Sequence, residues 1–262
     1  MTSDAQRRAV FLDEIGVGPL WVRRGAMAPQ AAEPAGMTGE IAVPLAAFDA
    51  DPQPMRPFRP EHAVPAASEV AAMDWAALKA SVADCAKCRL CQGRTQSVFG
   101  VGDEQARWLF VGEGPGRNED LRGEPFVGPA GKLLDNMLAA MGLRRGENAY
   151  IANIVKCRPT DDNGRDRPPT PEEAAACMPY LRRQIELIQP AVIVALGKTA
   201  ALSLLGLDPE TPVSTLRGRV HRYADRPLIV TYHPAYLLRN LPDKKKAWAD
   251  LCLALSTYAG LD

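Results

Sequence analysis

Short apolar runs alternate with helix-forming segments from residue 69 onward, and this alternation limits the fold more than any other feature of the chain. Four runs read as strands, at 107–112, 149–155, 191–197 and 227–232. Segments with helical spacing of apolar residues cover 74–85, 132–141, 171–188, 198–205 and 244–258, and a small hairpin is expected at 217–223. Continuously apolar strands that alternate with helices form parallel sheets covered on both faces. We therefore predict an α/β fold, a three-layer α/β/α domain with a four-stranded parallel central sheet, over residues 69–262.

The first 68 residues do not follow this pattern. Residues 25–68 are rich in Ala and Pro and lack sustained periodicity, which predicts a disordered linker. Residues 1–24 contain enough apolar side chains for a short amphipathic helix. We expect a partner-binding helix anchored by Phe11, Ile15 and Trp21, or a helix that folds back onto the domain.

Polar and turn-forming residues follow three of the predicted strands. The segments are Gly112-Glu-Gly-Pro-Gly, Asn153-Ile-Val-Lys-Cys and His233-Pro-Ala-Tyr. Ligands of parallel sheets bind beyond the carboxyl ends of the strands, so we expect one composite active site there. The first turn lacks the Lys-Ser/Thr of a P-loop and places a carboxylate where a phosphate would be repelled. Glu113 suits the positioning of a water molecule instead.

Cysteines are the second chemical signal in the chain. A CxxC pair precedes two cysteines that lie far downstream: Cys85, Cys88, Cys157 and Cys177. Four thiolates from two places could hold zinc or an iron–sulfur cluster, whereas the alternative makes the downstream pair ordinary buried residues. Cys91 extends the pair to CxxCxxC and competes as a ligand. Cys252 lies in an apolar helical segment and is expected in the core.

Four motifs occur in order between roughly residues 75 and 260. They are Glu113-Gly-Pro-Gly with Glu119-Asp120, Pro125-Phe-Val-Gly-Pro-Ala-Gly-Lys-Leu-Leu, Asn153-Ile-Val-Lys-Cys-Arg-Pro and His233-Pro-Ala-Tyr-Leu-Leu-Arg-Asn. Together they resemble the bacterial iron–sulfur, or family 4, uracil-DNA glycosylases, and their joint occurrence is highly specific. The resemblance implies a DNA-repair hydrolase that flips uracil out of DNA and cleaves its N-glycosidic bond, leaving an abasic site.

The same resemblance implies a 4Fe–4S cluster and favours iron over zinc. The four cysteines at the family's ligand positions are Cys85, Cys88, Cys157 and Cys177. Hydrolysis of a glycosidic bond needs no electron transfer, so the cluster is expected to be structural or to position DNA.

Four residues are expected, by resemblance, to bind the flipped base. Phe126 would stack on uracil, and Asn153 would read its amide edge. The backbone around Gly114 would approach the base closely, and Glu119 would stand where a thymine methyl group would have to go. Plainer alternatives remain for three of them: Phe126 as core, Asn153 as a turn former and Glu119 as the start of a solvated helix.

Two residues are expected to act on the bond that breaks, and two more to contact DNA. His233 would donate towards uracil O2 as charge develops there, and Glu113 would position or activate water. The alternative makes His233 a loop residue with satisfied hydrogen bonds. On a loop after the histidine, Leu237 would fill the gap left by the base and Arg239 would bind phosphate. The alternative is a helix start with Leu237 and Leu238 in the core. Residues 244–246 are three lysines that either contact the DNA backbone or form a solvent-exposed charged surface.

Three rival functions can be weighed from the residues. A covalent uracil-trapping relative carries a histidine-bearing basic loop after the third cysteine region, but residues 160–169 contain no histidine. Family 5 glycosylases lack the glutamate of the first motif, so Glu113 argues against them. The third is a non-catalytic iron–sulfur DNA-binding module, which a net charge of zero neither favours nor excludes.

Location and partners follow from weaker signals. No apolar run approaches the roughly 20 residues of a membrane helix, and the first ten residues are polar. We expect a cytoplasmic monomer without membrane contact. Its expected partner is uracil-containing DNA, single- or double-stranded, with a further protein partner for residues 1–24.

Overall fold

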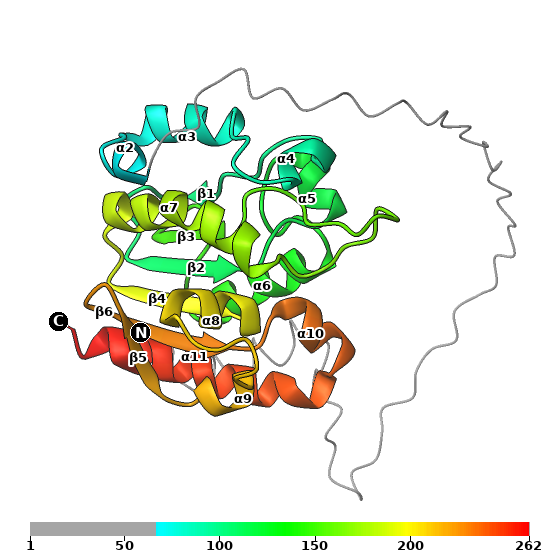
Figure 1. Ribbon diagram of the computed structural model, residues 1–262. Helices are drawn as coiled ribbons and strands as arrows, with labels where there is room; N and C mark the ends of the chain where they lie inside the picture. Colours follow the sequence, from blue (N-terminus) through cyan, green and yellow to red (C-terminus); the bar gives the residue numbers. More distant parts are fainter. Residues whose placement is uncertain (1–66, 262) are drawn as a thin grey trace, which may run out of the picture.

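The four strands predicted from the apolar runs form the centre of a six-stranded sheet in the computed structural model, which describes residues 67–261 (Figure 1). The strand order is β1-β3-β2-β4-β6-β5, and the central four are parallel. The strands are β1 (Val101–Gly102), β2 (Trp108–Gly112), β3 (Ala149–Asn153), β4 (Val192–Leu196), β5 (Val220–Tyr223) and β6 (Arg226–Thr231). The prediction of a parallel centre is confirmed, and β1 and β5 add an antiparallel strand at each edge.

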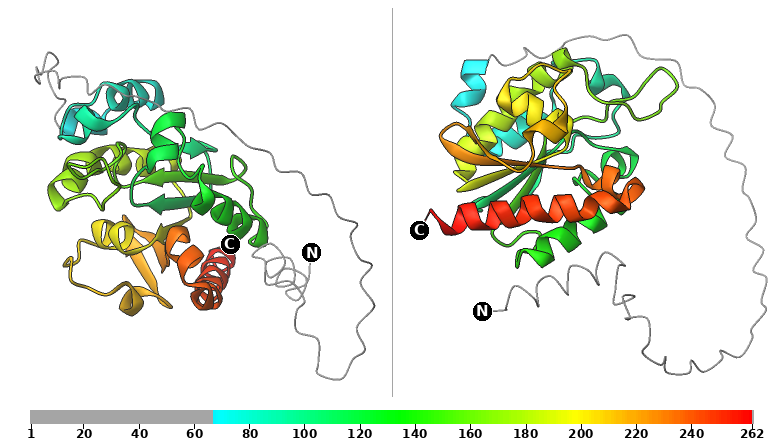
Figure 2. Two further views of the ribbon diagram at one scale, coloured as in Figure 1. Left: turned by 90° about the vertical axis from the view of Figure 1, so that its right-hand side faces the viewer. Right: turned by 90° about the horizontal axis from the view of Figure 1, so that it is seen from below.

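Helices cover both faces of the sheet, as the right-hand view of Figure 2 shows. One layer comprises α2 (Ala67–Ala71), α3 (Trp75–Ala83), α7 (Pro171–Ile188), α8 (Lys198–Leu205) and α9 (Val213–Leu216). The opposite layer comprises α6 (Pro129–Ala140), α10 (Pro234–Arg239) and α11 (Lys244–Ala259). Shorter elements complete the chain: α4 (Leu90–Gly93), α5 (Arg117–Arg122) and the 3₁₀ helix η1 (Leu241–Asp243).

Each central strand is buried on both sides because its side chains alternate between the two cores. In β2, Leu109 and Val111 pack beneath the α7 layer, whereas Trp108 and Phe110 pack against the α6 and α11 layer. All four are at most 1% exposed. A strand with two buried faces reads as a continuous apolar run, which is why the sequence pattern located the sheet.

Local capping explains where the predicted helices begin. Thr170 and Glu173 form a capping box at the start of α7, and Pro171 occupies its first position, where no amide donor is needed. Asp74 accepts a hydrogen bond from the Ala77 amide at 2.8 Å and starts α3.

Several boundaries differ from the predictions. Ala67 already begins α2, so two residues assigned to the linker belong to the domain. Residues 217–223 do not pair with one another, because Val220–Tyr223 forms its hairpin with β6. The segment after His233 is the helix α10 and not a loop. The predicted N-terminal helix and nearly all of the predicted linker lie outside the described residues. Within residues 67–261, no helix is long and apolar enough to cross a bilayer.

Candidate active site

The carboxyl ends of the central strands bring together the three polar segments singled out in the sequence. Gly112 ends β2 and is in register with Asn153 at the end of β3. The chain leaves β6 at Thr231 and reaches His233 two residues later, where α10 starts. In Figure 1 the arrowhead of β2 points towards the side on which α5, α6 and α10 lie. The three segments therefore lie at the edge of the sheet where we predicted a composite site.

Phe126 enters this site in an unusual backbone conformation. Its φ is 56°, a left-handed value that bulky side chains rarely adopt, and its side chain is only 6% exposed. The ring packs against the His233 imidazole with a centroid distance of 5.5 Å and an interplanar angle of 29°. Such strained residues persist only where the surroundings hold them, and they gather at functional sites.

Two charged residues hold the Phe126 loop in place. Glu119 Oε1 accepts hydrogen bonds from the amides of Val127 at 2.9 Å and Gly128 at 3.0 Å. Arg145 donates to the carbonyl oxygens of Pro125 and Phe126, at 2.8 Å each. Glu119 is therefore an anchor for the loop that presents Phe126. Arg145 was not identified from the sequence, because it lies 19 residues further along the chain in a turn without a motif.

Asn153 and Phe126 meet over the last residue of β2. A methyl group added to Gly112 would lie 2.5 Å from Asn153 Oδ1 and 2.6 Å from the Phe126 ring. Asn153 is 2% exposed, and its Oδ1 has no hydrogen-bond partner among residues 67–261. A buried acceptor is normally paired, so an unpaired one next to an aromatic ring needs an explanation. The arrangement suits a flat ligand that carries an N–H donor.

Gly112 is the glycine that allows Asn153 and Phe126 to approach each other, whereas the close approach of Gly114 to the base stays a prediction. A side chain on Gly114 would meet Val155 and Pro159, which pack beside the turn. Gly112 was missed as a site residue because it was counted simply as the end of an apolar strand. Its register with Asn153 is the signal that identifies it.

His233 is held in one neutral tautomer. Its Nδ1 accepts a hydrogen bond from the Ala235 amide at 3.1 Å and caps α10. Loss of solvent around the ring and, to a smaller extent, the charge of Arg239 lower the pKa of His233 to about 4, while Glu119 opposes the shift. The imidazole is therefore neutral at pH 7 and carries its proton on Nε2. This leaves Nε2–H as a hydrogen-bond donor within the site.

Glu113 is oriented by a residue that sequence reasoning did not identify. The hydroxyl of Thr199, the second residue of α8, donates to Glu113 Oε2. The Glu113 carbonyl oxygen accepts from the Val155 amide at 3.2 Å, which ties the turn after β2 to the segment after β3. One bond therefore orients the carboxylate, and the other fixes the main chain that carries it. The apolar strand that ends in Gly197, followed by Lys-Thr at a helix start, is the sequence signal for Thr199.

The two predicted DNA contacts on α10 have different surroundings. Leu237 is 1% exposed and packs in the core with α6 and α11, so the prediction that it fills a gap in DNA is wrong for this arrangement. Residues three apart share one face of a helix, and in α10 the buried residues Pro234 and Leu237 share the inward face. Arg239 is exposed at the end of the helix, and Leu238 is 40% exposed. Among the three lysines, Lys244 is largely buried.

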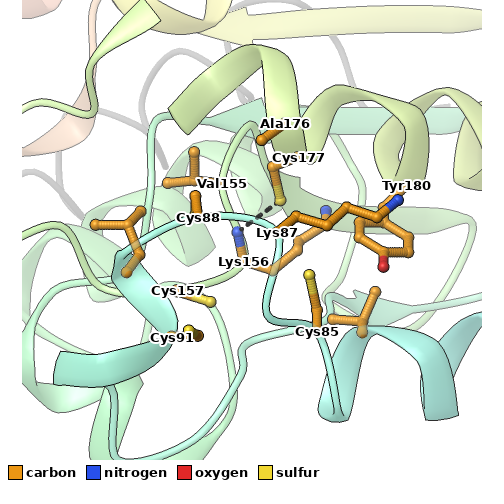
Figure 3. Close-up of a pocket in the computed structure, with 12 residues that line it drawn as sticks. Cys85, Lys87, Cys88, Cys91, Val155, Lys156, Cys157, Ala176, Cys177 and Tyr180 are labelled. Atoms are coloured by element: carbon orange, nitrogen blue, oxygen red, sulfur yellow. Dashed lines mark hydrogen bonds between the residues drawn. The ribbon is translucent and has the colours of Figure 1, made fainter. Parts of the chain in front are cut away.

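Five cysteines line one small cavity on the α7 side of the sheet, and Figure 3 shows how they surround it. They are Cys85, Cys88, Cys91, Cys157 and Cys177. Cys252 lies apart from them, in α11 on the opposite face of the sheet. Among residues 67–261, no group of three or more His, Cys, Asp or Glu side chains is close enough to hold a single metal ion.

Positive and amide donors already face two of these thiols. Arg94 donates to Cys157 Sγ at 2.9 Å, and the Lys156 amide donates to Cys177 Sγ at 3.3 Å. Burial raises the pKa of Cys157 to about 11 and that of Cys177 to about 12, while Arg94 and Lys156 oppose these shifts. Arg94 and Lys156 therefore offset part of the cost of placing negative charge on sulfur in this buried cavity.

The sequence of this chain is similar to those of known proteins from one superfamily. Residues 99–252 match the family described as the uracil DNA glycosylase superfamily. The chain is 52% identical over 163 residues to the type-4 uracil-DNA glycosylase of Archaeoglobus fulgidus, covering 60% of this chain and 79% of that protein. It is 48% identical over 160 residues to the type-4 enzyme of Thermotoga maritima, covering 61% and 80%. A type-5 uracil-DNA glycosylase of Pyrobaculum aerophilum is 30% identical over 153 residues, covering 53% and 66%.

Proposed function

The chain belongs to the uracil-DNA glycosylase superfamily, within its type-4 family, and we propose that it cuts uracil from DNA in the pocket formed by Gly112, Phe126, Asn153 and His233. The observation that carries this proposal is the buried, unpartnered Oδ1 of Asn153 beside the Phe126 ring. Uracil offers the N3–H donor that this oxygen needs, and its flat ring can stack on the phenyl group. The product in DNA is an abasic site.

Departure of the base is proposed to depend on a neutral histidine. Breaking the N-glycosidic bond leaves the electron pair on uracil, so negative charge develops on its O2 and O4 oxygens. In this proposal His233 Nε2–H donates to O2. The hydrogen bond from the Ala235 amide to Nδ1 supports this role, because it fixes the tautomer that carries the proton on Nε2. A preorganised donor of this kind stabilises the transition state more than the ground state, because charge grows during the reaction.

We propose that Glu113 directs a water molecule to the deoxyribose. The carboxylate, held by Thr199, orients a water molecule towards C1′ and accepts its proton as the new C–O bond forms. The sugar thereby becomes a 1′-hydroxyl and uracil leaves as the anion. The fixed position of the Glu113 carboxylate supports this role, since a general base must face the attacked atom.

Discrimination against thymine is proposed to reside in the loop that Glu119 anchors. Its two amide contacts fix Val127 and Gly128 next to Phe126, so the loop cannot move aside for a C5 methyl group. DNA contact is proposed for the exposed Arg239, which would bind phosphate. Single- and double-stranded DNA both remain substrates in this proposal, with a protein partner for residues 1–24 and a cytoplasmic monomer as the working unit.

The cysteine-lined cavity is proposed to hold a 4Fe–4S cluster through Cys85, Cys88, Cys157 and Cys177, with Cys91 as the competing ligand. The donor set supports this, because several thiols line one cavity and thiolates are the usual ligands of iron–sulfur clusters. When bound, the cluster supplies cross-links between the CxxC segment, β3 and α7, and it takes no part in the hydrolysis. The adjacent Arg94 would offset part of its negative charge.

Uracil release from single- and double-stranded oligonucleotides is the experiment that tests the function. We expect free uracil and an abasic strand that alkali cleaves, with repeated turnover and no protein left attached to DNA. A covalent trapping protein would stay on the strand, and a non-catalytic binding module would give no abasic product. Either result would overturn the proposal.

Replacing Gly112 with alanine should block the pocket without removing a catalytic group. The new methyl group would lie 2.5 Å from Asn153 Oδ1 and 2.6 Å from the Phe126 ring, so both must move. We expect kcat/KM for uracil release to fall about 10²-fold, because displacements near 1 Å at a site cost this much. Gly260→Ala is the matched control, since a side chain there makes ordinary contacts at 3.6 Å. Equal activity of both variants would show that Gly112 does not form a wall of the uracil pocket.

A further inference from the structure

Lys156 is a buried cation that the chemistry of uracil release leaves unused. Its side chain is 1% exposed. The ammonium donates to the Asn153 carbonyl oxygen at 2.9 Å and to Gln184 Oε1 at 2.6 Å. A buried charge is costly unless it is well hydrogen-bonded, so these bonds fix the ammonium in one place. Lys156 therefore fixes the main chain of Asn153, the residue proposed to read uracil.

The backbone of Lys156 faces the cysteine-lined cavity. Its amide donates to Cys177 Sγ, the bond drawn as a dashed line in Figure 3, and Cys157 is the next residue along the chain. Lys156 also lines the cavity together with both cysteines. Lys156 therefore bonds the main chain of Asn153 with its side chain and the Cys177 thiol with its main chain.

Gln184 completes a polar network around this lysine within the layer. Its amide nitrogen donates to the Phe99 carbonyl oxygen at 3.0 Å, and its own side chain is fully buried. Lys156 has little freedom to move without disturbing either Asn153 or the segment that carries Cys157. A buried network of this kind transmits a change at one end to the other, because its members are satisfied only together.

We propose that Lys156 is a positioning residue that couples the cysteine-lined cavity to the uracil pocket. The inference rests on the proposed function, since it takes the cavity as the cluster site and Asn153 as the uracil reader. Thiolates bound to the cluster hold the Lys156 segment, and the ammonium holds the Asn153 turn in the arrangement that accepts uracil. Coupling between two sites is reciprocal, so uracil must then strengthen retention of the cluster.

The first test uses the purified wild-type protein with its cluster. Loss of visible absorption is followed after an iron chelator is added, with free uracil, with thymine or with neither. We expect uracil to slow the loss about fivefold or more, the lower range of measured coupling between sites, and thymine to have no effect. Equal rates in all three samples would overturn the inference. Absence of visible absorption or of uracil release would instead show that the proposed function itself is at fault.

The second test removes the coupling residue while keeping its volume. Lys156→Met should still take up the cluster, but uracil should no longer slow its loss, and kcat/KM should fall about 10²-fold. Gln184→Met serves if the first variant does not fold, and it should reduce the protection by uracil. Arg94→Met provides the contrast, because Arg94 touches Cys157 and the structure gives it no bond to Asn153. We expect faster loss of the cluster there, with protection by uracil retained.

Arg183→Met is the control for general loosening of the α7 layer. Arg183 is adjacent to Gln184 on α7 and donates to the Met73 carbonyl oxygen at 2.6 Å, away from both sites. Its replacement should leave retention of the cluster, protection by uracil and activity unchanged. Protection that persists in Lys156→Met, or that disappears equally in Arg94→Met, would contradict a specific role for Lys156.

Discussion

His233→Ala should lower kcat for uracil release by about 10²–10³-fold, the effect of removing one preorganised donor to a developing oxyanion. The loss is expected in kcat more than in KM, because the bond to O2 strengthens as uracil leaves. Single-turnover release of uracil measures it. His221→Ala is the matched control, since that imidazole bonds the Leu216 carbonyl oxygen beside the edge strand β5. A loss below tenfold, or an equal loss in both variants, would remove His233 from the mechanism.

The same residue sets how activity should respond to pH. The pKa of His233 in the folded protein is about 4, below the value of roughly 6.5 for a free imidazole. The neutral donor therefore persists from pH 8 down to about pH 5, and His233 should cause no loss of activity in that range. On acidification the unfolded chain takes up this proton first. Stability from the neutral ring is complete above about pH 6.5 and is lost as pH falls towards 4.

The sheet could be predicted from the sequence because its strands are buried on both faces. Runs such as 191–197 have no polar interruption, so their apolar character located both the strand and the helices that cover it. The edge strands were predicted poorly for the opposite reason: the hairpin expected at 217–223 has the wrong partner, and β1 was not predicted. Val220–Tyr223 alternates exposed and half-buried residues, and Val101–Gly102 is too short to carry a pattern.

The candidate site was predictable where chemistry is tied to strand ends. Asn153 and His233 follow predicted strands, and the structure brings both to the Phe126 ring or its immediate neighbourhood. Contacts made by side chains from distant turns were not predictable. Arg145 and Thr199 belong to no motif, and their hydrogen bonds to the Phe126 loop and to Glu113 are defined only by the folded chain.

Leu237 shows the limit of assigning roles by motif alone. The motif placed a leucine after the histidine, but the helical start at Pro234 turns that side chain into the core. Pro at the first helical position is a strong signal for such a start, and it was available in the sequence. Giving it more weight would have favoured the alternative in which Leu237 packs against α6.

Cys157→Ala should abolish the visible absorption of the purified protein and lower its melting temperature by about 10 °C. Binding of a metal group by the folded state alone adds directly to its stability, and each kcal/mol shifts the midpoint of a domain this size by about 2–4 °C. The effect should be large at Cys157 because it follows the segment that carries Asn153. Iron and acid-labile sulfide analysis together with thermal unfolding measures both expectations.

Substitutions of the other cysteines test which thiols bind the cluster. Cys252→Ala is the control, since this thiol lies in α11 across the sheet, and the variant should keep full absorption. Cys91→Ala should also keep it if the four proposed thiols are the ligands, although Cys91 lines the same cavity. Loss of iron in Cys91→Ala with retention in Cys88→Ala would transfer the ligand role between them. Full absorption in Cys157→Ala would instead show that the thiol next to Lys156 binds no cluster. The structure would then give no reason to link the segment after β3 to a cluster in the cavity.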